Sequence, residues 1–476
     1  MSSNVVKRKD IPFIMLGLMM ALLMASLDST IVGTALPTIA MDLGGVEHYT
    51  WPVTAYMLSF TISLLIFGKL SDIYGRRSMF LLGLIIFILA SILCGMSQTM
   101  DQLIIFRGLQ GIGGGAISSI TFIIVGDMFS SRERGRYMGI LASMFALASV
   151  IGPYLGGFIT DNLDWRWVFY VNVPFGVLSM ALLYLKLPNF RSDHAKPNID
   201  YIGIGAVSLG IVPLLLAVSW GGSEMAWDSW EILTMVGISG ASLVFFIWWE
   251  GRAKEPVLPL QIFRKGTFNV ATLASALASF LMMGAIIAIT LYAQGVLGLD
   301  ATTSGQVLTP GVLALALTAI ITGRTISKTG KYRLFAIVGF AVCCLGAWLL
   351  SGIEMDTPLE QLYLYSAVLC IGVGMTMPVF SIAIQNVFEP HERATATASN
   401  RFLSNIGGTL GLSVLNSIIA ASLVGGFHPE ALLSSLQEAF WLCLGISLVG
   451  LVIVSLFLKE VPLRSHDAMV QVSHEV

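Results

Sequence analysis

Runs of about 20 apolar residues recur along almost the whole chain, and no other feature limits its fold as strongly. An α-helix of that length matches the hydrocarbon thickness of a bilayer, because a helix rises about 1.5 Å per residue. The runs are continuous, without the alternation of a transmembrane β-barrel, so they predict membrane-spanning helices. Fourteen are expected, at residues 11–36, 51–69, 78–97, 102–126, 136–160, 166–186, 201–219, 231–250, 268–297, 303–323, 334–352, 361–387, 395–424 and 436–458.

The composition excludes a soluble globular protein of 476 residues. Hydrophobic residues make up 56% of the chain and charged residues 11%, against about 25% charged in a soluble domain. The formal net charge of −2 offers no basic surface for phosphates, so we expect no nucleic-acid partner. All 5 cysteines lie inside apolar runs without metal-ligand spacing, which favours packing over a disulfide or metal site.

Basic residues are unevenly distributed between the loops. Nearly all of the 26 lysines and arginines fall in loops on one side of the expected spans. This positive-inside pattern requires an even number of spans, because one missed span would move every later loop to the other side. It predicts a multi-pass protein of the cell membrane with both termini in the cytoplasm.

Parts of the chain repeat each other. Residues 68–77 return in altered form as residues 323–332, and Arg134 with its neighbours returns around Arg393. Two six-helix bundles in the same orientation are the expected result, with a substrate path between them. The expected division is an N-terminal bundle at 1–187, a linker with two inserted helices at 188–265, a C-terminal bundle at 266–460 and a cytoplasmic tail at 461–476.

Five motifs resemble those of the major facilitator superfamily. Residues 68–77 and 103–115 resemble two of its signature motifs, and residues 148–157 resemble the fifth-helix motif of its exporters. Residues 27–37 and 165–176 are similar to marks of its fourteen-helix drug:proton antiporter group. The resemblance implies an all-α polytopic membrane protein with the major facilitator fold, in which two six-helix bundles and two inserted helices make 14 spans. It also implies a transporter driven by the proton gradient, without a cofactor.

Asp28 is the acidic residue that the sequence places deep in a span, and Arg107 is expected at a similar depth in the fourth span. A charge at the centre of a bilayer costs at least ~2.5 to 3.5 kcal/mol, which argues against an idle carboxylate. We expect Asp28 to carry the coupling proton or to bind a cationic substrate, with Arg107 tuning it. The alternative is a static structural pair, or an Asp28 that caps a kink.

The fifth span contains residues that permit a kink and close helix packing. They are Gly152, Pro153, Gly156 and Gly157. Proline removes a backbone donor, and glycines let a partner helix approach closely. The resemblance to the exporter motif implies that this segment shapes the gate between the halves, and helix packing alone is the alternative.

Charged residues at the turn between the second and third spans predict a conformational latch on the cytoplasmic side. We expect exposed ion pairs there, worth about 0 to 1 kcal/mol each, because such contacts can break in every cycle. The alternative is that these residues only anchor the cytoplasmic side. The candidate residues are Gly68, Asp72, Gly75, Arg76, Arg77, Asp127 and Arg134.

Polar and aromatic side chains within the spans are candidates for lining the substrate path. They are Tyr56, Phe60, Tyr292, Gln294, Gln385, Asn386 and Asn416. Each is equally suited to an interhelical hydrogen bond. For Arg401, two positions are open: snorkelling or pairing near the inner face, or lining the cavity. The second half has no deep carboxylate, which favours monocationic or neutral substrates over dications.

These features together predict a proton-coupled exporter of lipophilic, cationic or neutral drugs and toxic compounds, which works as a monomer in the lipid bilayer. A dedicated exporter of an endogenous metabolite, lipid or peptide is the alternative. A membrane-embedded enzyme is disfavoured, because the 6 histidines are scattered over loops and tails. The sequence contains no Gly-x-x-x-x-Gly-Lys-Ser/Thr loop, so we do not expect ATP to drive transport.

Overall fold

The computed structural model describes residues 5–44, 51–188, 200–221, 225–254, 256–299, 301–423, 429–463 and 471–473. Nearly all of this described chain is helical, as the apolar runs predict. The long helices are α1 (Ile11–Leu43), α2 (Trp51–Tyr74), α3 (Arg76–Gly95), α4 (Met100–Met128), α5 (Ser131–Asn162), α7 (Asn172–Lys186), α8 (Tyr201–Trp220), α9 (Trp230–Glu250), α10 (Gly266–Leu291), α11 (Ala301–Thr329), α12 (Arg333–Ser351), α13 (Leu359–Val387), α14 (Pro390–Leu423) and α15 (Pro429–Phe457). The short elements are α6 (Trp167–Tyr170), two 3₁₀ segments (Arg8–Asp10 and Leu260–Arg264), a π-helical turn (Tyr292–Val296) and the strands β1 (Val5–Lys7) and β2 (Gln471–Ser473).

Within the described chain, 14 helical segments are long and apolar enough to cross a membrane, which confirms the number expected from the sequence. Several helices begin earlier than their apolar runs. For example, α5 starts at Ser131, because Ser130 and Glu133 form a capping box at its first turn. A capped polar turn of this kind can extend a helix beyond the hydrocarbon region, where hydropathy no longer marks it.

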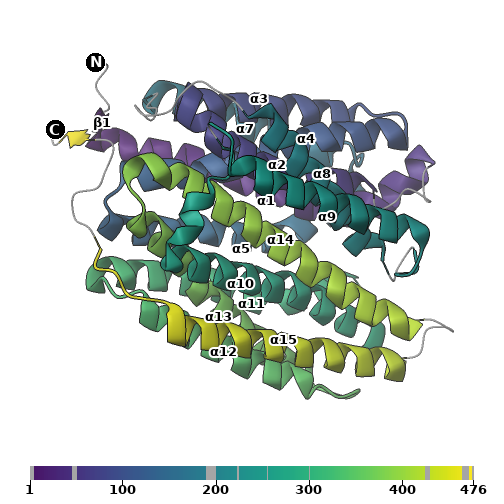
Figure 1. Ribbon diagram of the computed structural model, residues 1–476. Helices are drawn as coiled ribbons and strands as arrows, with labels where there is room; N and C mark the ends of the chain where they lie inside the picture. The colour runs from purple at the N-terminus through teal and green to yellow at the C-terminus, as the bar shows by residue number, and fades with distance from the viewer. Residues whose placement is uncertain are drawn as a thin grey trace.

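Helices α1–α7 form one bundle and α10–α15 form another (Figure 1). In the first bundle, α4 packs against α2 and α3, while α1 packs against α5 and α7. In the second, α13 packs against α11 and α12, while α10 packs against α14 and α15. The same neighbours in the same order are what a duplicated six-helix unit predicts. The exact limits of the halves stay predictions.

The two bundles meet through two equivalent helix pairs, α5 with α11 and α14 with α2. Gly135 and Gly323 bring α5 and α11 together so closely that a Cβ on either would meet the backbone of the other. Gly68 of α2 faces Ala398 of α14 just as closely. These contacts lie at the end of the bundles that carries the chain termini, which we call the termini face. The opposite end is the distal face.

Helices α8 and α9 form a hairpin beside the two bundles (Figure 1). Ser239 of α9 donates a hydrogen bond to the Gly210 carbonyl of α8 at 2.6 Å. At the base of the hairpin, the Trp249 indole donates to the Asp200 carboxylate. As far as the structure describes the pair, α8 makes the larger contact with the bundles, touching α2 of one half and α14 of the other. The position agrees with an inserted pair that lies beside the halves.

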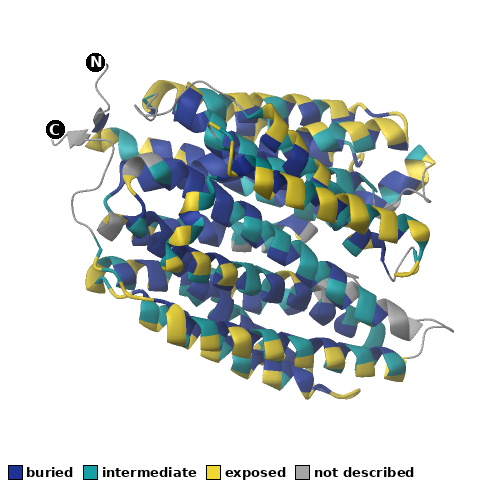
Figure 2. Cartoon of the chain, in the orientation of Figure 1, coloured by how far each residue is buried: buried dark blue, intermediate teal, exposed yellow. Residues whose placement is uncertain are grey.

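Exposed residues lie along the outer sides of the helices (Figure 2), and many of them are large and apolar. Among them are Leu89, Ile105, Val244, Leu317 and Leu456, all more than half exposed. A soluble protein rarely exposes so much continuous apolar surface. In a bilayer this surface faces lipid tails, so the structure agrees with a multi-pass membrane protein.

The two ends of the chain lie together. Strand β1 pairs in parallel with β2, with Val6 opposite Val472 (Figure 1). An even number of spans places the two termini on one side of the membrane, which this pairing requires.

Loops on opposite faces should differ in their access to a reagent added outside the cell. Asp228 and Asp356 are exposed at the distal face, and Lys328 is exposed at the termini face. We predict that a membrane-impermeant maleimide labels Asp228→Cys and Asp356→Cys in intact cells, after replacement of the native cysteines. Lys328→Cys should react only after the cells are made permeable. The reverse pattern would refute the orientation expected from the basic loops.

Candidate functional site

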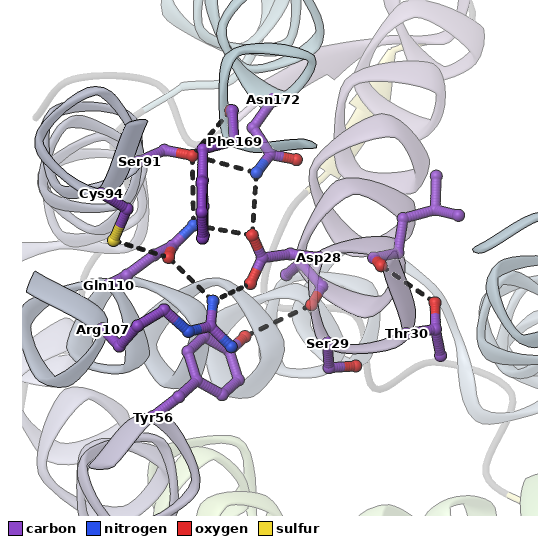
Figure 3. A network of polar contacts seen from close by, with 12 residues as sticks. Asp28, Ser29, Thr30, Tyr56, Ser91, Cys94, Arg107, Gln110, Phe169 and Asn172 are labelled. Atoms are coloured by element: carbon purple, nitrogen blue, oxygen red, sulfur yellow. Dashed lines mark hydrogen bonds and ion pairs between the residues drawn. The ribbon is translucent and has the colours of Figure 1, made fainter. Parts of the chain in front are cut away.

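Asp28 and Arg107 form a buried ion pair inside the first bundle (Figure 3). Arg107 Nη1 donates to Asp28 Oδ2, and the side-chain amides of Gln110 and Asn172 donate to Oδ1 at 2.8 and 2.9 Å. Asp28 lies near the midpoint of α1, and its partners come from α4 and α7. The structure therefore brings together the two residues that the sequence singled out.

Gln110 and Asn172 were not singled out from the sequence, although they complete the network. Both amides also donate to Ser91 Oγ of α3, and Ser91 in turn donates to the Phe169 carbonyl (Figure 3). Each amide lies within one of the stretches that resemble superfamily motifs, 103–115 or 165–176. Their location in these motifs was the one feature of the sequence that could have identified them, because a lone amide in a span has no other distinguishing mark.

Tyr56 supports the ion pair from the side of α2. Its ring centroid lies 4.3 Å from the Arg107 guanidinium carbon, and its hydroxyl donates to the Ala25 carbonyl. Phe60 stacks on Tyr56 with ring centroids 5.8 Å apart. Tyr56 therefore packs directly on the charge pair, and Phe60 packs on Tyr56 behind it.

The donors around Asp28 suit the charged carboxylate. An ionised carboxylate only accepts hydrogen bonds, and three side-chain donors converge on this one. Adding a proton would place a donor where Arg107 or an amide already donates, so the network would have to rearrange. This chemistry suits a proton carrier, and the same geometry also suits the static pair, so both interpretations stay open.

The glycines of α5 pack against the helix that carries Asp28. A Cβ on Gly152 would collide with Thr30 of α1, and one on Gly156 would collide with Thr34. Thr30 also donates to the Ala148 carbonyl of α5 at 3.2 Å. Gly157 has open space around it. The side chain of Pro153 lies outside the described residues.

The candidate latch is buried, so the expectation of exposed ion pairs is wrong. Arg76 pairs with Asp72 at 2.6 Å and with Asp127 at 2.8 Å, and all three side chains are almost inaccessible. The second bundle covers them: Thr395 of α14 donates to Asp72 at 3.4 Å. A buried pair is costly to break one partner at a time, which a surface pair is not.

Two other latch candidates lie outside this triad. Gly75 forms the turn between α2 and α3 with φ of 95°, a conformation that favours glycine. Arg77 points to the end of α7, where it donates to the Leu187 carbonyl at 3.2 Å. It therefore stays within its own bundle.

Two arginines cross between the bundles in a reciprocal exchange. Arg134 of α5 donates to the Gln385 carbonyl of α13, and Arg393 of α14 donates to the Gly126 carbonyl of α4, both at 3.3 Å. Each carbonyl lies in the last turn of its helix, where the helix dipole attracts a cation. Arg393 was not among the predicted latch residues, although the repeat that relates it to Arg134 was the signal.

A cavity lies between the halves, with walls from α4, α5, α10, α13 and α14. Arg401 of α14 lines it, which decides between the two positions left open by the sequence. Its guanidinium carbon lies 3.2 Å from the centroid of the Phe122 ring and 5.7 Å from that of Phe145. Hydroxyl groups and one amide share the wall. They belong to Ser275, Ser279, Thr376, Ser381, Asn400 and Ser404.

The other polar candidates for the path do not line this cavity. Tyr292 donates to the Glu354 carbonyl at 2.6 Å, and Gln294 is exposed. Gln385 donates across the halves to the Phe122 carbonyl, and Asn386 donates to the Val461 and Pro462 carbonyls. An interhelical hydrogen bond, the alternative role, accounts for Gln385, whereas Tyr292 and Asn386 donate to carbonyls of segments outside the helices. The side chain of Asn416 lies outside the described residues.

Comparison with known proteins agrees with this arrangement. A sequence profile of the Major Facilitator Superfamily matches residues 18–412. The chain belongs to the major facilitator superfamily. Members of this superfamily are membrane transporters, which confirms the resemblance and the fold class inferred from the motifs.

Individual proteins support the assignment to the superfamily. The chain is 41% identical to the "Multidrug transporter protein MdtP" of Bacillus subtilis, over 85% of this chain and 74% of that protein. It is 35% identical to an "Acurin A biosynthesis cluster MFS-type transporter" of Aspergillus aculeatus, over 86% and 76%. The solved proton:xylose symporter XylE superposes with a TM-score of 0.70 at 13% identity, over 97% and 98% of the two chains, which shows the shared fold.

The contact between α1 and α5 predicts opposite effects for two neighbouring glycines. Gly152→Ala should force the helices apart and destabilise the transporter by about 1 to 3 kcal/mol, the usual cost of overpacking. Gly157→Ala should stabilise the transporter slightly, by up to about 1 kcal/mol, because nothing lies within contact of its Cβ and alanine favours a helix over glycine. Thermal unfolding of the purified variants in detergent measures the difference. Equal midpoints for the two variants would contradict the close contact.

The exchange between Arg134 and Arg393 predicts that either arginine holds the termini face closed. Ser327 of α11 accepts a hydrogen bond from the Arg136 backbone across the two halves. We expect Arg134→Ala or Arg393→Ala to raise the maleimide reactivity of Ser327→Cys in inverted vesicles several-fold. Arg77→Ala is the matched control, because the hydrogen bonds of Arg77 to described residues lie within its own bundle. An equal rise in the control would show a general loosening instead.

Proposed function

We propose that this transporter is a proton-coupled exporter of lipophilic drugs and toxic compounds, located in the cell membrane with both termini in the cytoplasm and active as a monomer. The observation that carries the proposal is the ion pair of Asp28 and Arg107 in the middle of the first bundle. The name of the multidrug relative from Bacillus subtilis supports a broad range of drug substrates.

The position of Asp28 favours a role in proton coupling. In the described helices the other acidic residues lie nearer to a helix end, where water is closer. A buried charge at this depth is expensive, and evolution could have replaced it with an apolar residue at little cost to folding. Protonation of Asp28 would remove the charged partner of Arg107 and leave it the neutral Gln110 Oε1, which already accepts from Arg107 Nη1 at 2.9 Å.

A direct path connects Asp28 to the closed end of the protein. Helix α1 packs through Thr30 and Thr34 on the glycines of α5. Helix α5 carries Arg134 and contacts α11 of the other half. A movement of α1 on protonation would therefore reach the gate through α5, which supports alternating access driven by a proton.

A second candidate function differs from the first in its substrate range. A dedicated exporter of an endogenous metabolite, lipid or peptide is favoured by the relative that belongs to a biosynthesis cluster. Drug susceptibility of an efflux-deficient host that expresses the protein separates the two. Protection against several unrelated lipophilic compounds supports the broad exporter, and protection against none supports the dedicated one.

Replacement of Asp28 tests the coupling directly. Asp28→Asn imitates a permanently protonated residue, so it should abolish proton-driven efflux while the protein still folds and inserts. For the native protein, raising the external pH should slow efflux, because it removes the inward proton gradient. The measurement is efflux of a fluorescent lipophilic compound from energised cells, normalised to protein level.

Asp42→Asn is the matched control for this change. Asp42 lies near the distal end of the same helix, is half exposed and faces Arg166. This variant should keep efflux and its dependence on the gradient. Native efflux rates from Asp28→Asn with intact dependence on the gradient would place the coupling site elsewhere and refute the mechanism.

A further inference from the structure

The cavity between the halves contains a cation without a counter-charge. Among the described residues Arg401 takes part in no ion pair, and its Nε makes no hydrogen bond. The residues that line the cavity include no aspartate or glutamate. The guanidinium therefore presents donors that no acidic side chain of the wall satisfies.

Four fully buried arginines differ from the partly exposed Arg401 in this respect. Arg76 and Arg107 each pair with aspartate, while Arg134 and Arg393 donate to carbonyls at helix ends. Each has a protein acceptor for its charge. An arginine that keeps its charge at a cavity wall without such an acceptor is costly, unless an acceptor arrives from outside the chain.

The side chains around Arg401 indicate what kind of molecule would carry that acceptor. The Phe122 ring packs against the guanidinium but offers its N–H groups no carboxylate or carbonyl oxygen. Ser404 lies one turn further along α14 and donates to Ser275 of α10 at 2.7 Å, so small polar groups flank the charge. Large apolar side chains form the rest of the wall. They are Phe122, Met138, Phe145, Met377 and Phe380.

We propose that this cavity binds amphipathic organic anions, with the carboxylate or sulfonate of the substrate on Arg401 and its apolar part against the aromatic side chains. The proposal rests on the proposed export function, because it names the substrate class of the same path. It departs from the sequence-based expectation of cationic or neutral substrates, since an unpaired arginine repels a cation. A planar guanidinium matches the two oxygens of a carboxylate.

Three probes that differ only in their polar group test this inference. Pyrenebutyrate, pyrenebutanol and pyrenebutylamine share one ring system and one chain length, and carry a negative, a neutral and a positive group. Binding to the purified full-length protein in nanodiscs is measured by equilibrium dialysis against empty nanodiscs. We expect the native protein to bind the anion about tenfold or more tightly than the alcohol, and the amine most weakly.

Two variants of Arg401 assign the preference to its charge. Arg401→Gln should lower the affinity for pyrenebutyrate about tenfold, to that of pyrenebutanol, and leave the alcohol nearly unchanged. Arg401→Lys should keep part of the preference, because it keeps the charge without the planar fork.

A third variant tests the proposal without removing the arginine. Ser404→Asp places a carboxylate three residues from Arg401 on the same helix, at a spacing that allows an ion pair. It should abolish the preference for the anion even if the Arg401 variants do not fold. Gln361→Asp adds the same charge at an exposed position outside the cavity and should change nothing.

The outcomes separate this inference from the proposed function. The anion site is overturned if the native protein binds the amine more tightly than the anion. It is also overturned if the preference for the anion survives Arg401→Gln or Ser404→Asp. Proton-driven transport of the three probes is then measured in proteoliposomes. Anion binding that depends on Arg401, without proton-driven transport of any probe, overturns the export function and supports the site. Proton-driven transport of the alcohol or amine, without a binding preference for the anion, supports the export function and overturns the anion site.

Discussion

The cost of a charge in a hydrocarbon environment governs this structure. The bilayer removes the water that would otherwise solvate an ionised side chain, so each buried charge needs a partner within the protein. Arg107 meets this requirement through Asp28, and Arg76 meets it through two aspartates. The pairs hold α1 to α4 and hold α3 to both α2 and α4, so the electrostatic requirement also fixes how the first bundle packs. Arg401 is the informative exception.

Duplication gives the protein two similar halves that carry different charges. The arginines that cross the interface are equivalent, and each reaches the end of the equivalent helix in the other half. The ion pairs behind them are not equivalent, because Asn386 takes the place in the second half that Asp127 has in the first. The contacts that are equivalent in the two halves at the termini face are therefore hydrogen bonds from arginine to backbone carbonyls. The charged triad and the proposed proton site both lie in the first bundle. Protonation would therefore act on one side of the otherwise symmetric interface between the bundles.

The sequence predicts the fold to a large extent, because a bilayer leaves few choices. Length and continuous hydrophobicity identify all 14 spans, and the repeat predicts that the neighbours of α4 correspond to those of α13. The candidate site is predicted less completely. Asp28 and Arg107 stand out as rare charges in apolar surroundings, whereas Gln110 and Asn172 do not, since amides are common in spans as interhelical hydrogen bonds. The burial of Asp72 and Arg76 depends on a second bundle that no local pattern reveals.

The amino-acid sequence by itself determined which segments lie in the membrane, how many there are and which residues bring charge into it. Local hydropathy is sufficient for these features, because the transfer of each helix into a bilayer depends on its own composition. Only the tertiary structure decided which charges are satisfied. Whether Arg401 pairs, snorkels or lines a cavity depends on side chains contributed by α4, α5, α10 and α13, far apart in the chain. Long-range packing places an aromatic ring against its guanidinium and leaves its wall without a carboxylate, and this placement gives the cavity its positive charge.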